Sequence, residues 1–181
     1  LIGVTKEEID IAAEKAKHTN AEFTFDGEKL ICSGTSAHAS LPENGNNPIT
    51  ALFELLSYID FDSECTEFAN SLKALFPHGK YNGEALDVDM SDMLGRLTLT
   101  LDVVRFENGK FDGCFDTRTP MSATKENCAD VIAASLRKHG FEIENTKMRE
   151  AHYVDENSDF IKTLLRTYED YSGDKGECIS M

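Results

Sequence analysis

The chain has 181 residues, of which 40% are apolar, and carries a formal net charge of −15 at pH 7. This length suits one domain or two tightly joined lobes around a sizeable core. The acidity argues against nucleic acid and anionic membranes as partners, because both are bound by basic patches. No apolar run approaches the roughly 20 residues that span a bilayer.

Five cysteines occur without a C-x-x-C pair. An odd number of cysteines without such a pair favours reduced, mostly buried thiols in a reducing compartment, rather than a disulfide scaffold or a zinc ribbon. We therefore expect a cytoplasmic protein.

The N-terminal part predicts a helix followed by a hairpin. Thr5 and Glu8 form a capping box, and apolar residues recur on one face of the helix that it opens. The segments 22–25 and 29–32 flank Asp26-Gly27, a dipeptide typical of a tight hairpin turn.

Two helices are predicted next. Asn47 is suited to cap the first, with Pro48 at a position where no amide donor is needed. The second is expected to end at Pro77 and to turn inward Cys65, Phe68, Ala69, Leu72 and Leu75. In the irregular stretch 77–93, Asp87-x-Asp89-x-x-Asp92 lacks the glycine and the glutamate of a calcium loop, so a solvated acidic loop is favoured.

The C-terminal half predicts a long hairpin, 96–106 with 110–118, across Asn108-Gly109. Alternation along its first strand places Leu97, Leu99, Leu101 and Val103 on a buried face. A helix from about Lys125, a strand near 141–153 and a last helix that ends at Gly173 complete the chain.

The predicted order gives an α+β fold. Strand, helix, two paired strands, helix and strand form a βαββαβ, ferredoxin-like layer with one antiparallel sheet and helices on one face. The helical stretch 64–76 is an addition to that layer.

One histidine is presented by small residues between a strand and a helix. The segment reads Gly34-Thr35-Ser36-Ala37-His38-Ala39-Ser40-Leu41-Pro42, then Gly45-Asn46-Asn47-Pro48. Small neighbours let another molecule approach the ring of His38.

This segment resembles the G-x-x-A-H-x-x-x-P…G-x-N-A pattern of the zinc aminoacylase/carnosinase superfamily, in particular the bacterial peptidase V-type dipeptidases. Leu94–Thr100 is similar to a family strand reading G-x-L-T-x-N, 115–120 to D-x-R-x-P, and 151–173 to P-x-Y-V…Y-x-x-x-T-G. The order agrees along almost the whole chain.

The resemblance implies that residues 1–181 are the lid domain of a larger two-domain metallopeptidase. The zinc-ligand motifs H-x-D, D-D-K-G and D-E-E do not occur. No metal site is therefore expected in this chain, and the two zinc ions would belong to the missing catalytic domain. The isolated chain is expected to be inactive.

The family's lid roles map onto particular residues here. His38 matches the histidine that stabilises the oxyanion, a role that requires a donor aimed at the carbonyl oxygen. Arg118 matches the arginine that binds the substrate carboxylate, and a guanidinium suits that partner through two parallel hydrogen bonds. The alternative for Arg118 is an ion pair with Asp116 or Asp102.

Two further positions match the family less closely. Asn47 matches the G-x-N-A asparagine, although helix capping explains it equally well. Thr100 stands where the family strand has asparagine, so a substrate contact there is expected to be weaker.

Two functions remain open. The first is a substrate-clamping lid of a zinc dipeptidase, with the catalytic domain and a dipeptide as partners. The second is a pure oligomerisation domain that forms a homodimer through the sheet edge or a helix, with no direct catalytic role. Whether His38 and Arg118 project to the same surface discriminates between them.

Overall fold

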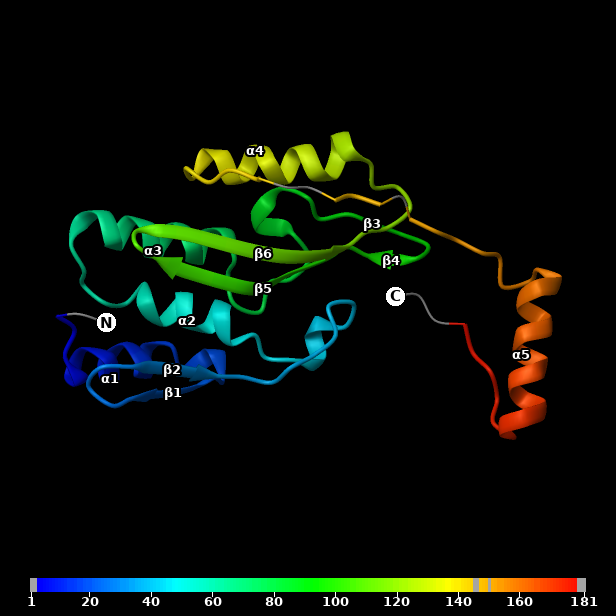
Figure 1. The fold of residues 1–181 in the computed structure, drawn as a ribbon, viewed down its shortest axis with the longest axis horizontal. Helices are drawn as coiled ribbons and strands as arrows, with labels where there is room; N and C mark the ends of the chain where they lie inside the picture. Colours follow the sequence, from blue (N-terminus) through cyan, green and yellow to red (C-terminus); the bar gives the residue numbers. More distant parts are fainter. Residues whose placement is uncertain (1–2, 145–146, 150, 179–181) are drawn as a thin grey trace.

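The structure, a computed structural model, describes residues 3–144, 147–149 and 151–178. The helices in this part are α1 (Lys6–Lys15), α2 (Pro48–Leu56), α3 (Ser63–Leu75), α4 (Asp130–Lys138) and α5 (Asp159–Ser172) (Figure 1). The strands form three antiparallel hairpins: β1 (Glu22–Phe25) with β2 (Leu30–Ser33), β3 (Ser91–Asp92) with β4 (Gly95–Arg96), and β5 (Thr98–Glu107) with β6 (Lys110–Arg118). The predicted α+β class is confirmed.

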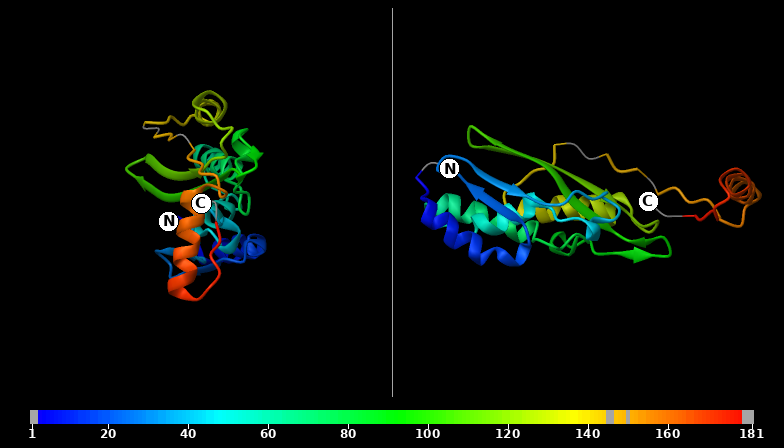
Figure 2. Two further views of the ribbon diagram at one scale, coloured as in Figure 1. Left: turned by 90° about the vertical axis from the view of Figure 1, so that its right-hand side faces the viewer. Right: turned by 90° about the horizontal axis from the view of Figure 1, so that it is seen from below.

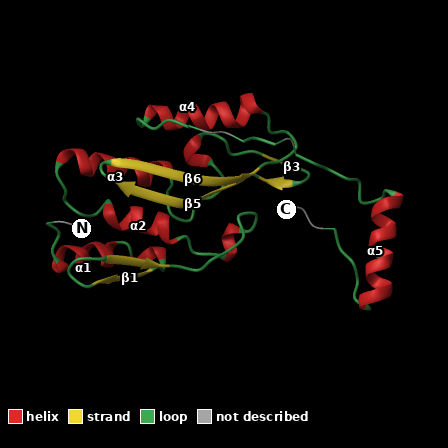
Figure 3. Ribbon diagram, in the orientation of Figure 1, coloured by secondary structure: helices red, strands yellow, loops and turns green. Residues whose placement is uncertain are grey.

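Helix α2 is the centre of the fold, because it is buried on two sides (Figures 1 and 3). Phe53 packs into the larger apolar cluster, which α3, β5 and α4 supply. Leu55 and Ile59, on and just after the same helix, pack into a second cluster with α1 and the β1–β2 hairpin. The two clusters therefore share one helix.

The α1 and β1–β2 unit forms as its sequence predicts. The Thr5 backbone N–H donates to Glu8 Oε2 at 2.8 Å, and the Glu8 N–H donates to Thr5 Oγ1 at 3.3 Å, which completes the capping box. In the hairpin turn, Asp26 Oδ1 accepts the backbone N–H of Lys29 at 2.8 Å, and Gly27 has φ +104°. Because these bonds join residues close in sequence, short motifs are enough to predict the helix start and the hairpin turn.

The β5–β6 hairpin forms across Asn108-Gly109, both with positive φ, as a two-residue turn of this type requires. Its pairing is interrupted by a bulge between Leu101 and Val103. The extra residue reverses the alternation, so Val103 is 50% exposed and Val104 packs on the core instead. The prediction that Val103 lies on the buried face is therefore wrong.

The predicted strand near 141–153 is not formed in residues 141–144, 147–149 and 151–153; the other positions lie outside the described residues. Three apolar side chains of this segment, Phe141, Ile143 and Met148, still pack on the larger cluster. The alternate spacing of Phe141 and Ile143 therefore reflects burial of their side chains, without backbone pairing in a sheet. The described hairpins consequently remain separate two-stranded sheets rather than one ferredoxin-like sheet.

The cysteines are less buried than predicted. Cys128 is buried and Cys32 half-buried, whereas Cys65, Cys114 and Cys178 are exposed, and none forms a disulfide. Cys65 was expected to face inward, but it lies in the first turn of α3, where its N–H donates to the capping Asp62. Burial raises the pKa of the Cys32 thiol to about 11.

Helix α5 stands apart from the body of the fold (Figures 1 and 2). Ser158 caps it and Gly173, with φ +78°, ends it as predicted. None of its residues is buried, and Phe160 and Tyr168 are 65% and 52% exposed. In the described part of the chain, no helix combines the length and apolar character needed to cross a membrane.

A buried carboxylate joins α2 to α3. The Glu54 side chain is 8% exposed, and its Oε1 lies 2.8 Å from Lys73 Nζ and accepts the Tyr58 hydroxyl at 2.7 Å. Burial raises the Glu54 pKa, but these bonds, with the charges of Lys73 and His18, outweigh burial and hold the pKa below its ordinary value.

Lys73→Met should leave Glu54 buried without its cation and lower the free energy of unfolding by about 2 to 3 kcal/mol, since Lys73 itself is only partly buried. The native pKa of Glu54 is depressed, so this stabilisation is complete above its ordinary value of 4.5 and is lost as the pH falls through the native value. Urea unfolding at pH 7 and at pH 3.5 measures both effects.

Lys6→Met is the matched control, because Lys6 forms an exposed pair with Asp10. It should change stability by less than about 0.5 kcal/mol at either pH. A Lys73→Met loss no larger than that of the control would show that Glu54 does not depend on Lys73.

Candidate functional site

His38 lies in a loop whose two ends are held together. The Thr35 N–H donates to Asn46 O at 3.0 Å, and the Asn46 N–H donates back to Thr35 O at 2.8 Å. We call this pair of bonds the neck of the His38 loop. Asn46 Nδ2 also donates to the carbonyl of buried Thr19 at 3.0 Å, which ties the neck to the end of the α1 segment.

Glycines make the neck sterically possible. A Cβ on Gly34 would lie 2.0 Å from Asn46 O, and a Cβ on Gly45 would lie 2.7 Å from the Cβ of Ala37. Such distances require the backbone to move. The small residues that the sequence shows around His38 therefore close the loop as well as leave space beside the ring.

The far side of the loop is attached to β5. Thr98 Oγ1 donates to the carbonyl of Ala39, the residue after His38, at 2.8 Å. Thr98 lies directly opposite Arg118 in the β5–β6 ladder, and directly opposed residues project from the same face. The structure thus brings the His38 turn and Arg118 to one face of the hairpin, although 80 residues separate them in sequence.

The His38 ring is exposed and fixed by its own turn. Nδ1 accepts the backbone N–H of Ser40 at 3.3 Å and lies 2.8 Å from Ser40 Oγ. Because Nδ1 accepts a backbone N–H, the hydrogen of a neutral ring is carried by Nε2. The turn therefore selects the tautomer that can donate from the outer nitrogen.

Arg118, at the end of β6, is paired within its own strand. Its Nε donates to Asp116 Oδ1 at 2.8 Å and its Nη2 to Asp116 Oδ2 at 3.1 Å. The side chain is 40% exposed. Of the five N–H donors of a guanidinium, two are used by this pair. The ion pair with Asp116 that the sequence offered as an alternative is present.

Asn47 and Thr100 are bonded to the protein itself. Asn47 Oδ1 accepts the Ile49 N–H and caps α2, while its Nδ2 donates to Leu101 O of β5, both at 2.9 Å. Thr100 lies opposite Asp116 on the same face as Arg118, and its hydroxyl donates to Asp102 at 2.9 Å. Asn47 thereby fixes the start of α2 to the strand that carries Thr100.

The acidic loop has no metal geometry. Among the described residues, no group of three or more His, Cys, Asp or Glu side chains is arranged to hold a metal ion. Asp87 bonds Ser135, Asp89 bonds Arg96, and Asp92 accepts the N–H of Ser122. The pKa of each of the three carboxyls is lowered: by Ser135 and Lys138 at Asp87, by Arg96 at Asp89, and by the backbone N–H groups of Leu94 and Ser122 at Asp92.

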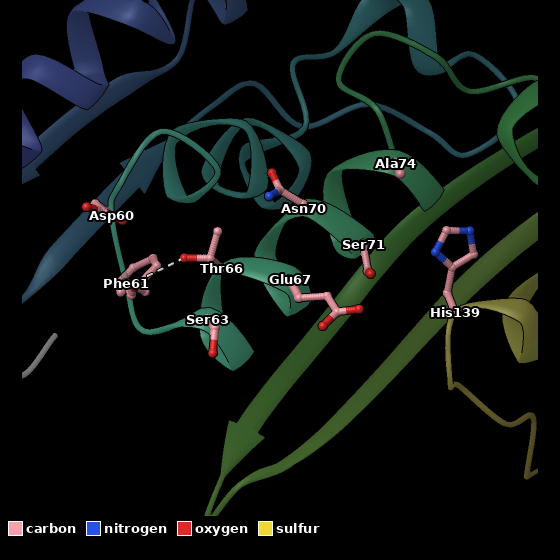
Figure 4. Close-up of a pocket in the computed structure, with 9 residues that line it drawn as sticks. All are labelled: Asp60, Phe61, Ser63, Thr66, Glu67, Asn70, Ser71, Ala74 and His139. Atoms are coloured by element: carbon pink, nitrogen blue, oxygen red, sulfur yellow. Dashed lines mark hydrogen bonds between the residues drawn. The ribbon is translucent and has the colours of Figure 1, made fainter.

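Two hollows are formed by described residues. One of about 90 Å³ lies between the start of α2 and β5 and is lined in part by Asn47, Thr50, His78 and Thr100. The other, of about 760 Å³, lies along α3 and faces His139 (Figure 4). Its lining includes none of the four site residues predicted from the sequence.

Sequence reasoning missed the residues that assemble the site. Alternation places Thr98 on the face opposite Leu97 and Leu99, and Thr35 and Asn46 fall between predicted elements, so the sequence predicts none of these contacts. Their contacts join positions up to 59 residues apart, as between Thr98 and Ala39. The alternation of β5 predicts that Thr98 points away from the core, but it gives no partner.

The fold and site define an α+β domain that presents a histidine and an arginine on one face of a hairpin. The sequence model described as "Peptidase dimerisation domain" matches residues 20–140, two-thirds of the chain. This chain belongs to the peptidase dimerisation domain family. The match covers the His38 loop and Arg118 and excludes α5.

Similar proteins come from bacteria. The chain is 22% identical over 184 residues to "Putative dipeptidase SH1171" of Staphylococcus haemolyticus, covering 95% of this chain and 39% of that protein. It is 29% identical over 150 residues to "Putative dipeptidase YtjP" of Bacillus subtilis, covering 82% and 32%. It is 27% identical over 166 residues to "Putative dipeptidase SAUSA300_1697" of Staphylococcus aureus, covering 88% and 35%. The chain thus spans about a third of the length of these relatives.

Gly45→Ala should open the neck of the His38 loop. Gly45 has φ −115°, which alanine adopts without strain, so the effect comes from the contacts of the new methyl with Ala37 and Thr35. We expect a loss of about 1 to 3 kcal/mol in unfolding free energy and faster hydrogen exchange at the Thr35 and Asn46 amides.

Gly113→Ala is the control, because a Cβ there meets mainly the movable ring of Phe111 at 3.2 Å. Its stability should stay within about 0.5 kcal/mol of the unmodified chain. Equal exchange rates at the neck in both variants would contradict the steric role of Gly45.

Proposed function

We propose that this chain is the lid of a dipeptidase and supplies two substrate contacts, His38 and Arg118. The observation that carries the proposal is the Thr98–Ala39 hydrogen bond, which places the His38 turn beside the cross-strand partner of Arg118. The related proteins are named as dipeptidases, which supports a dipeptide as the substrate.

His38 would act as the oxyanion donor. Hydrolysis of a peptide bond develops negative charge on the carbonyl oxygen in the tetrahedral intermediate, and a donor aimed at that oxygen stabilises the transition state selectively. The Ser40 N–H on Nδ1 supports this role, because it leaves the hydrogen of a neutral ring on the exposed side. The ring needs no proton transfer to act.

Arg118 would bind the free C-terminal carboxylate of the dipeptide. Three of its N–H donors are not used by Asp116, which supports a shared arrangement in which the guanidinium holds Asp116 on one side and substrate on the other. Asp116 would then orient the guanidinium group of Arg118 and partly neutralise its charge.

Asn47 and Thr100 have lesser parts in this proposal. Both polar atoms of the Asn47 side chain already bond the protein, which supports an orienting role at the base of the site. The Thr100 hydroxyl hydrogen is used by Asp102, so Thr100 would meet substrate as an acceptor.

The zinc ligands of the proposed dipeptidase would belong to its catalytic domain and not to this lid. The donor types needed for a dinuclear zinc site do not gather in the part of the chain that the structure describes. The lid's first partner would therefore be its own catalytic domain, and this chain alone would not hydrolyse peptides. A cytoplasmic location remains a prediction from the cysteine pattern.

Oligomerisation without a catalytic role is the second candidate. The family description names dimerisation, and the β5–β6 hairpin exposes Val103 at 50% and Phe106 at 60%. Because residues three apart on a strand point to opposite faces, association through the edge of the hairpin, rather than through one face, would bring both side chains near the partner copy. The two candidates differ in what His38 does, since a pure interface needs no histidine in the loop.

His38→Ala tests the lid proposal in the protein encoded by the complete reading frame. It should lower kcat/KM for a dipeptide by roughly 100-fold or more, mainly through kcat, because the donor is needed in the transition state. The side-chain bonds of His38 stay within its own turn, so folding should be unchanged. Exposed His139→Ala is the control, and near-normal turnover of His38→Ala would favour the oligomerisation candidate.

Arg118→Ala should instead raise KM for substrates with a free C-terminal carboxylate. Loss of a bidentate charge pair that is buried in the substrate complex costs on the order of 2–5 kcal/mol. Amidated dipeptides should bind poorly from the outset and lose little more on mutation. Arg105→Ala, elsewhere on the hairpin, is the control. Equal losses for free-acid and amidated substrates in Arg118→Ala would show that Arg118 supports the structure and does not bind the substrate carboxylate.

A further inference from the structure

His78 is a half-buried histidine that the proposed chemistry does not use. It follows α3 and lies between two other segments. Its Nε2 is 3.1 Å from the carbonyl oxygen of Thr19, and its Nδ1 is 2.9 Å from the hydroxyl of Thr50 in the first turn of α2. Both ring nitrogens therefore have a protein partner.

The proton positions follow from the partners. A carbonyl oxygen only accepts, so Nε2 carries the hydrogen and donates to Thr19. In the neutral ring, Nδ1 is then an acceptor and shares the one hydroxyl hydrogen of Thr50 with the Asn47 carbonyl, which lies 3.2 Å from Thr50 Oγ1. Burial lowers the pKa of His78 and outweighs the Thr19 bond and the charge of Glu54, which raise it; His18 lowers it further. The neutral ring is thus the form that the fold favours.

Both partners of His78 also contact residues at the end of the His38 loop. The carbonyl of Thr19 also accepts Asn46 Nδ2, so one oxygen bonds the ring and the neck together. Thr50 lies within 3.2 Å of the carbonyl of Asn47, the next residue after the neck. Through Thr19 and Thr50, the ring is therefore connected to Asn46 and Asn47, two consecutive residues at the end of the loop.

We propose that His78 is a positioning residue for His38, which it serves by fixing the Thr19 carbonyl that holds the neck of the loop. The catalytic consequence rests on the proposed function of His38. Without the Nε2 donor, the Thr19 carbonyl would keep only the side-chain bond from Asn46 Nδ2, and its orientation would be less fixed. The loop would then depend more on the two backbone bonds of the neck and on Thr98.

Variants of His78 separate this role from simple filling of space. In His78→Gln, the side-chain amide reaches the place of Nε2 and can donate to Thr19; His78→Asn places its amide near Nδ1 and reaches Thr50 only. His78→Leu keeps bulk and loses both bonds. Positioning through Thr19 predicts that Gln restores the neck and that Asn and Leu do not.

Hydrogen exchange of this chain measures the neck directly. The Thr35 and Asn46 amides, which form it, should exchange about tenfold faster in His78→Leu and His78→Asn and less than about threefold faster in His78→Gln, as expected for one lost hydrogen bond. The Ile9 amide in α1 serves as an internal control, and His139→Leu as the control variant. Unchanged exchange at the neck in His78→Leu, or equal effects of Gln and Leu, would overturn the proposal.

Kinetics of the protein encoded by the complete reading frame test the link to His38. His78→Leu should lower kcat/KM about tenfold, mainly through kcat, and should cause no further loss in a His38→Ala background, because two residues that act through one group are not additive. Additive losses would overturn the link. If His38→Ala itself had no effect, the proposed function would fail, whereas neck exchange would still decide whether His78 positions the loop.

Discussion

Burial of α2 on two sides is the constraint on which the rest of the structure depends. Phe53 serves one apolar cluster and Leu55 the other, so the helix cannot rotate or slide without leaving one of them. Its N-cap residue is equally fixed, because Asn47 bonds both the Ile49 N–H and the Leu101 carbonyl. The neck of the His38 loop comes immediately before this point. The position of the loop is therefore set by the core as well as by its own bonds.

The same constraint explains the buried charge. Since α2 is covered on both sides, Glu54, between Phe53 and Leu55, is only 6% exposed as a residue. A carboxylate in that position is tolerated only with strong partners, which Lys73 and Tyr58 supply. The pair also sets how α3 lies on α2, and α3 leads directly into His78. A stability element and the site are thus connected through one helix.

Features that depend on short sequence patterns were predictable, and features that depend on long-range packing were not. The Thr5 capping box, the Asn47 cap and the Asn108-Gly109 turn all form, because each motif contains its own bonding partners. The bulge that exposes Val103 leaves no residue signature beyond regular alternation. The segment from Phe141 shows how alternation can arise from side-chain burial alone.

In the candidate site, too, some features follow from short sequence patterns and others depend on long-range contacts. Motifs and residue chemistry point to His38 and Arg118, whereas the bond between Ala39 and Thr98, the residue paired with Arg118, joins positions that no local pattern connects. The surface exposure of three cysteines has a similar origin. Cys65 has the spacing of a core residue, but it falls in the first turn of α3, where its N–H donates to Asp62 and its side chain is exposed.

The acidity of the chain bears on how the proposed site would work. A net charge of −15 disfavours the approach of a carboxylate, and Asp116 already neutralises much of Arg118 at the surface. An exposed arginine in this setting would bind a dipeptide weakly in open solvent, where salt screens the attraction. The attraction becomes strong only when water is excluded and the effective dielectric constant falls. Binding would therefore be coupled to closure of the lid. Arg118 and His38 are held in advance by Asp116 and Ser40, so closure would lose little side-chain entropy at the moment when both contacts form.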